Sequence, residues 1–263
     1  MPKKTAKTFN LNGKQTGKTE LPPVFSTPIR PDVIKRAVLA IQSSRRQPQG
    51  RDPMAGKRTT AESRGTGLGL ARVPRVKGPR GNAAFAPGVV GGRQAHPPVS
   101  AKRILKRIPK KEKQLALKSA IAATAQKDLI VLRGHSLEGV LEIPLITTDD
   151  LEELRKTKEV EEALIGLGLL SDIYRVQESR KIRAGKGKRR GRRIKQAVGP
   201  LIVVGENKGI VEAARNILGV EAVTARNLNT EMLAPGTHPG RLTVWTTSAL
   251  AKLAEFYGKG EQA

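Results

Sequence analysis

The sequence predicts an α/β protein: a parallel sheet with helices on both faces in a Rossmann-like three-layer arrangement, and a long irregular basic loop inserted near the N-terminus. The sheet is predicted by short, wholly apolar runs such as 201–204 that are followed by stretches with helical apolar spacing. Strands buried on both faces have continuous apolar runs, and their alternation with amphipathic helices is typical of parallel sheets. The loop is predicted because residues 43–100 are rich in Gly and Pro and lack hydrophobic periodicity.

The first forty residues predict two extended pieces and a helix. Residues 5–25 contain short extended segments around a turn at Asn12-Gly13. After Pro31, a residue suited to the start of a helix, apolar side chains recur at helical spacing as far as Ile41. We expect this helix to end near Ser43-Ser44, where the basic loop begins.

The middle of the chain returns to regular structure. The spacing predicts a helix over 117–124, and apolar runs predict short strands at 129–132 and 143–146. The acid-rich segment 149–162 is typical of one or two helices, and residues 173–178 are a further strand candidate.

The last third alternates clearly between the two kinds of element. We expect strands at 201–204, 221–225 and 242–245. Apolar stripes predict helices over 210–218 and 250–257. Val204-Gly205 is then an ordinary strand-to-helix turn, because its glycines match no dinucleotide or phosphate-binding spacing.

Two stretches carry most of the positive charge. Residues 43–107 contain 15 Lys and Arg with Asp52 and Glu62 as the sole acids, and residues 180–195 contain 10 Lys and Arg with no acid. Their net charges of +13 and +10 supply most of the formal +26, so the rest of the chain is nearly neutral. A neutral body with two concentrated cationic segments is suited to binding a polyanion.

We therefore divide the chain into a body and its basic segments. Residues 1–42 and 101–263 form one globular α/β domain, residues 43–100 form an extended loop, and residues 180–195 form a second basic segment. So long an irregular segment inside a domain indicates either a functional loop or disorder. A disordered basic linker stays open for 43–100, and a targeting run or solvated loop stays open for 180–195.

The sequence offers no catalytic or metal-binding constellation. Cysteine is absent, and His96, His135 and His238 have no partner at metal-ligand spacing, so we interpret them as polar loop or surface residues. The glycine run 65–69 lacks a preceding strand, which a dinucleotide site requires. The acids at 149–153 are explained by a solvated helix start. We expect no enzyme, no metal and no cofactor.

Composition also bears on location. No apolar run approaches the ~20 residues that span a bilayer, and the N-terminal residues 1–7 have no apolar stretch after them. We expect a cytoplasmic protein with no membrane partner and no homo-oligomer.

Of the seven aromatic residues, only Phe85 falls in a basic stretch, so contacts by Arg, Lys and glycine backbone are expected to exceed base stacking.

Specific strings in the chain resemble the large-subunit ribosomal protein L4 family in its archaeal branch. The loop contains Arg64-Gly65-Thr66-Gly67 followed by 71–75 (ARVPR), and its end contains 95–98 (AHPP). Further matching strings are 21–25 (LPPVF), 61–63 (AES), 118–124 (KSAIAAT), 182–187 (IRAGKG), 233–236 (LAPG) and 239–244 (PGRLTV). Eukaryotic members carry a long C-terminal extension, and this sequence stops soon after Tyr257, which favours the archaeal assignment.

The resemblance implies a structural constituent of the large ribosomal subunit that binds rRNA and supports subunit assembly. It implies that the long loop threads through rRNA to the constriction of the polypeptide exit tunnel. There it would meet a protein of the ribosomal L22 family and, transiently, the nascent peptide. The residues expected at the tunnel wall are Arg64, Gly65, Thr66, Gly67, Leu68, Arg72 and Arg75.

The rRNA-binding residues implied are the cationic side chains of both basic stretches. In the loop and its flank they are Arg45, Arg46, Arg51, Lys57, Arg58, Arg64, Arg72, Arg75, Lys77, Arg80, Arg93, Lys102, Arg103, Lys106 and Arg107. In the second segment they are Arg180, Lys181, Arg183, Lys186, Lys188, Arg189, Arg190, Arg192, Arg193 and Lys195.

Two other readings stay open. A general nucleic-acid-compacting protein would use the same charge without a fixed rRNA site. An α/β enzyme with a basic substrate loop would need a ligand pocket at the carboxyl ends of the strands.

Overall fold

The structure, a computed structural model, describes residues 5–258. Most of the N-terminal stretch in which we expect no secretory signal therefore lies outside the described residues. The chain divides into two compact units, Met1–Ile41 with Arg107–Ala263, here called the body, and Gln42–Lys106, here called the basic loop. Within residues 5–258, no helix is both long and apolar enough to cross a membrane.

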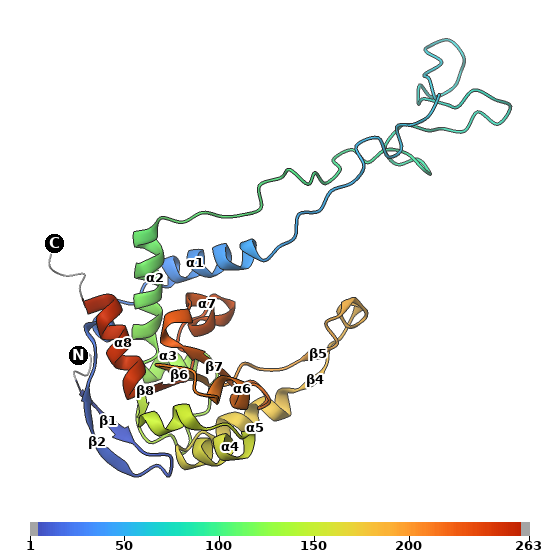
Figure 1. The fold of residues 1–263 in the computed structure, drawn as a ribbon. Coiled ribbons are helices and arrows are strands. Elements are labelled where there is room, and N and C mark those ends of the chain that lie inside the picture. The colour runs from blue at the N-terminus through green and yellow to red at the C-terminus, as the bar shows by residue number, and fades with distance from the viewer. Residues whose placement is uncertain (1–4, 259–263) are drawn as a thin grey trace. The chain divides into compact units, whose positions relative to one another are not determined.

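A six-stranded sheet forms the centre of the body (Figure 1). Its strand order is β2-β1-β3-β8-β6-β7, and every neighbouring pair is parallel except the hairpin of β1 and β2. The α/β class is confirmed, and the sheet is mixed because this N-terminal hairpin adds one antiparallel edge strand. The strands are β1 (Thr5–Phe9), β2 (Gln15–Glu20), β3 (Leu145–Thr147), β6 (Leu201–Val204), β7 (Glu221–Thr224) and β8 (Thr243–Thr246).

Two apolar clusters lie against the sheet, and alternate residues of one strand belong to different clusters. Leu201 and Val203 of β6 pack in the first cluster, whereas Ile202 and Val204 pack in the second. Successive side chains of a strand point to opposite faces, so both faces of β6 are buried. The continuous apolar run of this strand follows from that burial.

The helices supply the other side of each cluster. The first cluster takes residues from η1 (Pro23–Ser26), α1 (Pro31–Ser44), α2 (Lys110–Ala123), η4 (Ala225–Asn227), α7 (Thr230–Leu233) and α8 (Thr247–Gly258). The second takes residues from α3 (Lys127–Leu132), η2 (Asp149–Glu153), α4 (Thr157–Gly166), α5 (Leu170–Ser179) and α6 (Ile210–Ala214). A further short helix is η5 (Pro235–Thr237).

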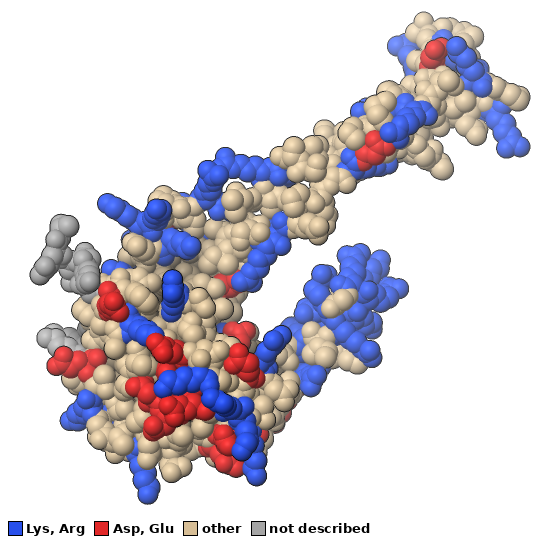
Figure 2. Space-filling model, in the orientation of Figure 1, with Lys and Arg blue, Asp and Glu red and all other residues tan. Residues whose placement is uncertain are grey.

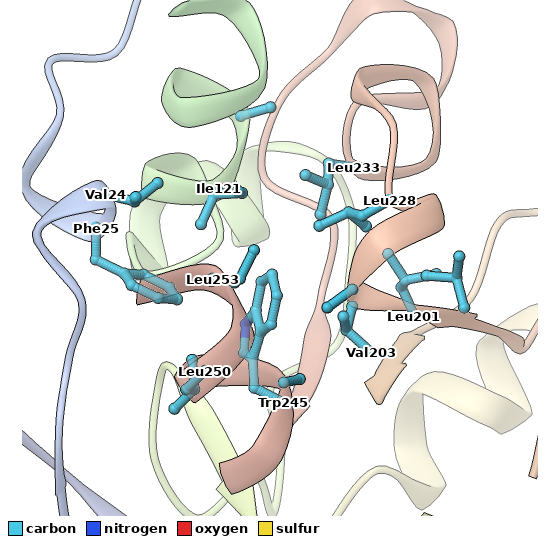
Figure 3. Close-up of a cluster of buried hydrophobic side chains, with 14 of the residues drawn as sticks. Val24, Phe25, Ile121, Leu201, Val203, Leu228, Leu233, Trp245, Leu250 and Leu253 are labelled. Atoms are coloured by element: carbon cyan, nitrogen blue, oxygen red, sulfur yellow. The ribbon is translucent and has the colours of Figure 1, made fainter. Parts of the chain in front are cut away.

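Trp245 of β8 is the largest fully buried side chain of the first cluster (Figure 3). The ring of Phe25 meets it edge-to-face, with the ring centroids 5.6 Å apart and the planes at 80°. Val203 on the neighbouring strand is also fully buried. Burial of each such side chain contributes about 2 kcal/mol, which makes this cluster sensitive to polar substitution.

Two predicted strands are wrong. Residues 129–132 lie in helix α3, where Ile130 is buried but Leu132 is 83% exposed. Residues 173–178 lie in helix α5, whose Ile173 and Val176 are buried three positions apart on one side. A short apolar run fits a strand or a helix equally well, and only its burial in the fold separates the two.

The other predicted elements are confirmed with shifts of their ends, the largest at α2, which begins at Lys110 instead of 117, except that residues 23–25 of the first extended stretch form η1. The N-terminal turn joins β1 to β2, and the side-chain oxygen of Asn10 accepts hydrogen bonds there from the backbone N–H groups of Asn12 and Lys14. Helix α1 begins at Pro31 and ends at Ser44, as its residues predict. Helix α6 stops at Ala214, shorter than the predicted 210–218, and the strand predicted at 143–146 is β3.

Candidate nucleic-acid interface

Lys and Arg side chains gather on the basic loop and on residues 180–195, whereas Asp and Glu gather on the body (Figure 2). The basic loop begins with the last residues of α1, 42–44, and its residues 45–106 lead to α2 without forming a helix or a named strand. In Figure 1 its two irregular segments run side by side toward a lobed end. A few backbone contacts hold the two segments together.

Close backbone approach joins the two segments of the loop. The N–H of Arg51 donates to the carbonyl of Pro98 at 3.0 Å. Gly56, at φ 76°, comes so close to Gly92 that a Cβ at Gly56 would lie 2.6 Å from the Gly92 backbone. Only glycine suits that position, because a side chain would both strain the backbone and clash.

Arg75 joins three segments of the basic loop. Its backbone exchanges both hydrogen bonds with Glu62 at 3.0 and 3.1 Å, and it also bridges to Ala83. Its guanidinium donates to the carbonyl of Gly81 at 3.0 Å. We expected Arg75 to be an exposed contact residue, but its side chain is half-buried and organises the loop.

Two turns project from this central pairing. In the first, Ser63 donates through Oγ to the carbonyl of Arg72 at 2.9 Å, which closes residues 64–71 into an exposed turn. Leu68 in this turn is 58% exposed. The second turn, residues 77–81, is closed where the N–H of Val76 donates to the carbonyl of Asn82 at 3.0 Å.

The glycine run at 65–69 is therefore part of an exposed turn. No strand precedes it and no helix follows it, so it lacks the setting of a dinucleotide-binding loop.

Phe85, the aromatic residue of the basic loop, has an unusual backbone. Its φ is 61°, and the N–H of Ala86 donates to the carbonyl of Ala84 at 2.7 Å across it, which forms a γ-turn. The guanidinium of Arg93 lies 6.0 Å from the centre of its ring, at the limit of a cation–π contact.

Residues 180–195 form a small antiparallel hairpin, here called the basic ribbon. Strands β4 (Lys181–Ile182) and β5 (Ile194–Lys195) pair so that Lys181 faces Lys195 and Ile182 faces Ile194. The tip is the short helix η3 (Lys186–Arg190). Among the described residues, no ribbon cation forms an ion pair.

A polar network that is only partly buried holds the base of the ribbon. The N–H of Ala197 donates to Oγ of Ser179 at 2.8 Å, and Arg175 donates to the carbonyl of Val198 at 2.9 Å. Arg175 also donates through Nε to Asp172 at 2.8 Å. Both ends of the ribbon are therefore tied to α5.

His135 completes this network. It lies in a loop, one of the two positions predicted for it, but it is buried and not at the surface. It is 6% exposed, and its Nδ1 lies 3.1 Å from both carboxylate oxygens of Asp172. Burial lowers the pKa of His135, although Asp172 opposes the shift. Burial acts to raise the pKa of Asp172, but hydrogen bonds from His135 and Arg175 outweigh it, and the pKa is lowered. His96 and His238 are exposed, as expected.

Glu152 also departs from its predicted solvated position. It is 2% exposed and lies beside the carboxyl ends of β6 and β8. Its carboxylate accepts from the N–H of Gly205 at 2.7 Å, from Oγ1 of Thr246 at 2.9 Å and from Oγ of Ser248. These three donors meet Oε1, and Oε2 accepts the N–H of Glu206 at 3.3 Å, so the carboxylate ties the ends of the two strands together.

The 25 predicted RNA-binding side chains lie in three places. Fourteen belong to the basic loop, ten to the basic ribbon, and Arg107 lies just before α2. Most are exposed; the half-buried ones are Lys57, Arg75, Arg93 and Arg183. The loop cations engaged with loop groups include Arg51 with Gln94, Arg58 with Asp52, and Lys77 with Glu62.

Within residues 5–258, no group of three or more His, Cys, Asp or Glu is placed to hold a metal ion. In the two basic segments, the sequence did not indicate the internal role of Arg75 or the exposed Ile182–Ile194 pair. The alternation of residues 181–183 and 193–195 could have revealed the second, because a hairpin of that register puts isoleucines on one face.

A family model and several individual proteins are similar to this chain over almost its whole length. Residues 19–256 match the model of the "Ribosomal protein L4/L1 family". The protein of Methanosphaera stadtmanae called "Large ribosomal subunit protein uL4" is 51% identical over 251 residues, which cover 95% of this chain and 96% of that protein. Proteins with the same description are 49% identical in Archaeoglobus fulgidus, over 95% of this chain and 98% of the relative, and 48% identical in Saccharolobus islandicus, over 98% and 96%.

Proposed function

The chain belongs to the ribosomal protein L4/L1 family, and from this we propose that it is a structural constituent of the large ribosomal subunit. It binds rRNA, supports assembly of the subunit and resides in the cytoplasm within the ribosome. The family is one of ribosomal proteins, so we assign no catalytic activity. The observation that supports this proposal best is the concentration of Lys and Arg in the basic loop and the basic ribbon.

The charge of these segments matches a phosphate-rich partner. Most of their cations are exposed, and the loop backbone is open and rich in glycine. Arg and Lys neutralise phosphates, while glycine lets the backbone approach RNA closely. In this proposal the exposed members of the 25 predicted residues contact the phosphates, and half-buried Arg75 shapes the loop that carries them.

We further propose that the loop reaches the polypeptide exit tunnel. In this proposal, residues 43–100 extend through rRNA, and the exposed turn 64–71 lines the tunnel near its constriction. Residues 1–42 and 101–263 form one globular domain with a Rossmann-like three-layer arrangement. The turn meets a protein of the L22 family and, transiently, the nascent peptide. The hydrogen bond from Ser63 to Arg72 closes the turn, and Leu68 within it is exposed. Both observations support the assignment, because the side chains of the turn are accessible to partners.

Binding to large-subunit rRNA tests the function. The full-length protein is titrated into large-subunit rRNA and into an unrelated structured RNA of equal length, from 100 to 400 mM KCl. We expect a preference for the large-subunit rRNA that persists at the highest salt. If ten or more phosphates are contacted, the log–log salt slope is about −7 or steeper. Equal affinity for both RNAs would favour a general nucleic-acid-compacting protein.

A photo-crosslinker tests the tunnel assignment separately. Because the chain has no cysteine, a single Leu68→Cys change directs the crosslinker to the turn in assembled subunits. Crosslinks to a nascent chain support the assignment, and crosslinks confined to rRNA distant from the tunnel contradict it. A crosslinker at Val198→Cys, on the body, serves as the control.

A further inference from the structure

The basic ribbon has two chemically different faces. Register puts Lys181 opposite Lys195 and Ile182 opposite Ile194, and the N–H of Arg183 donates to the carbonyl of Arg193 at 2.8 Å. Side chains alternate between the faces of a hairpin. Lys181, Lys195, Arg183 and Arg193 therefore share one face, and the isoleucine pair lies on the other.

The cationic face repels itself. Like charges directly opposite each other on neighbouring strands destabilise the pairing, and this ribbon has two such pairs in succession. Residues 180–195 contain no acid that could compensate them. The arrangement is favourable only beside an anion of matching length, and a phosphate backbone supplies one.

The isoleucine face is exposed and unoccupied by the body. Ile182 is 61% exposed and Ile194 is 47% exposed. Two exposed arginines, Arg180 and Arg192, stand two positions before these isoleucines along the chain, just outside the paired residues of β4 and β5. The face thus has an apolar centre and a cationic rim.

A nucleotide has the complementary distribution, with an apolar base or ribose edge in the centre and phosphate at the rim. RNA also exposes unstacked bases in loops and bulges, where proteins contact them. An ordinary protein surface would cover the isoleucines but leave the rim cations without counter-charge. Charge complementarity therefore favours RNA for this face too.

We propose that the basic ribbon is inserted between two RNA segments. Its cationic face binds the phosphates of one, and the Ile182–Ile194 face packs on base or ribose edges of the other. This inference rests on the proposed rRNA binding and specifies how one part of the chain achieves it. The ribbon begins directly after α5, and the hydrogen bonds from Ala197 to Ser179 and from Arg175 to Val198 hold the chain that leaves it against the same helix, so that inserting the ribbon costs little further ordering.

Salt dependence separates the contributions of the two faces. Full-length variants Lys181→Gln/Lys195→Gln and Ile182→Ser/Ile194→Ser are titrated into large-subunit rRNA. The lysine variant is expected to reduce the magnitude of the salt slope by about 1.4 to 1.8, since each phosphate contact contributes roughly 0.7 to 0.9. The isoleucine variant is expected to bind about tenfold more weakly at every salt concentration, with an unchanged slope.

Two control variants match these changes on the body. Lys158→Gln removes one exposed lysine of α4, and Ile165→Ser removes an isoleucine of α4 that is 49% exposed. Neither is expected to change affinity or slope. All replaced ribbon residues are exposed, so thermal melting of the body is expected to stay the same.

Crosslinking tests the two-segment geometry. A short photo-crosslinker at Lys181→Cys and one at Ile182→Cys are expected to react with different rRNA segments. Reaction of both with the same nucleotides would overturn the proposal. An isoleucine variant with wild-type affinity for RNA would also overturn the proposal. If that variant were incorporated poorly into subunits, the isoleucine face would bind a protein instead of RNA. A wild-type protein without preference for large-subunit rRNA would instead refute the proposed function itself.

Discussion

The guanidinium of Arg75 donates a hydrogen bond to the carbonyl oxygen of Gly81 at 3.0 Å. Since the backbone of Arg75 also pairs with Glu62 and bridges to Ala83, this one residue joins three segments at the end of the basic loop. A cation at that place shapes the two neighbouring turns. Arg64, eleven positions earlier, is exposed in the first turn. The two arginines therefore have different roles within one loop.

Replacing Arg75 is expected to loosen the loop without affecting the body. Arg75→Ala removes a hydrogen bond of about 1 kcal/mol, so exchange of the Val76 and Ala84 amides should accelerate several-fold. Arg64→Ala is the matched control and should leave those amides unchanged. Hydrogen-exchange mass spectrometry on the free protein measures both. Equal acceleration in the two variants would contradict the internal role of Arg75.

Neither arginine substitution is expected to change the melting temperature of the body, because exposed or loop-confined charges contribute little to a packed core. A large decrease for Arg64→Glu or Arg75→Glu would show that the loop and the body are not energetically separate.

The core of the body should not tolerate charge. Val203 is fully buried on β6, and Val203→Asp places an unpaired carboxylate there. We expect a loss of more than about 4 kcal/mol, enough to unfold a domain of ordinary stability. Val198→Asp, at a position 37% exposed just before the strand, should cost less than about 1 kcal/mol. Urea unfolding followed by circular dichroism distinguishes these outcomes.

Adjacent glutamates give a second matched pair. Glu152→Ala leaves the donors of Gly205, Thr246 and Ser248 without their acceptor, which should cost about 3 kcal/mol. Glu153 pairs with Lys208 in solvent, and Glu153→Ala should cost less than about 0.5 kcal/mol. Equal losses in thermal unfolding would contradict the tie between strand ends.

His135 should make stability depend on pH. Its pKa in the folded protein is lowered from 6.5, first by burial and then by Arg175 and Arg133, while Asp172 opposes this. The unfolded chain therefore binds the proton more readily, and stability from the neutral imidazole is present above about pH 6.5 and is lost as the pH falls below it.

The variant His135→Gln removes this titration. The difference in melting temperature between pH 7.5 and pH 5.0 should become smaller than in the wild type. His96→Gln, at an exposed position, should retain the wild-type difference. An unchanged pH dependence in His135→Gln would contradict a buried neutral imidazole.

Much of the fold could be predicted because its signals are local. Strand β6 is buried on both faces of the sheet, so all of its residues are apolar. Helix α1 is buried on one face, so its apolar residues recur at helical spacing. The run at 129–132 carries no period, so its helix could not be distinguished from a strand. The hairpin turn at Asn12-Gly13 is local as well, and it was predicted.

The features that escaped prediction depend on partners distant in sequence. His135 is buried because Asp172 lies beside it, 37 positions away, and Glu152 because Gly205 lies beside it, 53 positions away. The charge of the candidate interface was evident from composition. The internal role of Arg75 was not, since it depends on how residues 62, 75 and 83 pair.

The measurement that tests the central claim most directly is sedimentation of a cell lysate through a high-salt gradient, followed by detection of this protein. As an integral component of the large subunit, it should remain with that subunit at salt concentrations that remove loosely bound cationic proteins. Its release to the top of the gradient would contradict a fixed rRNA site and favour a general nucleic-acid-binding protein.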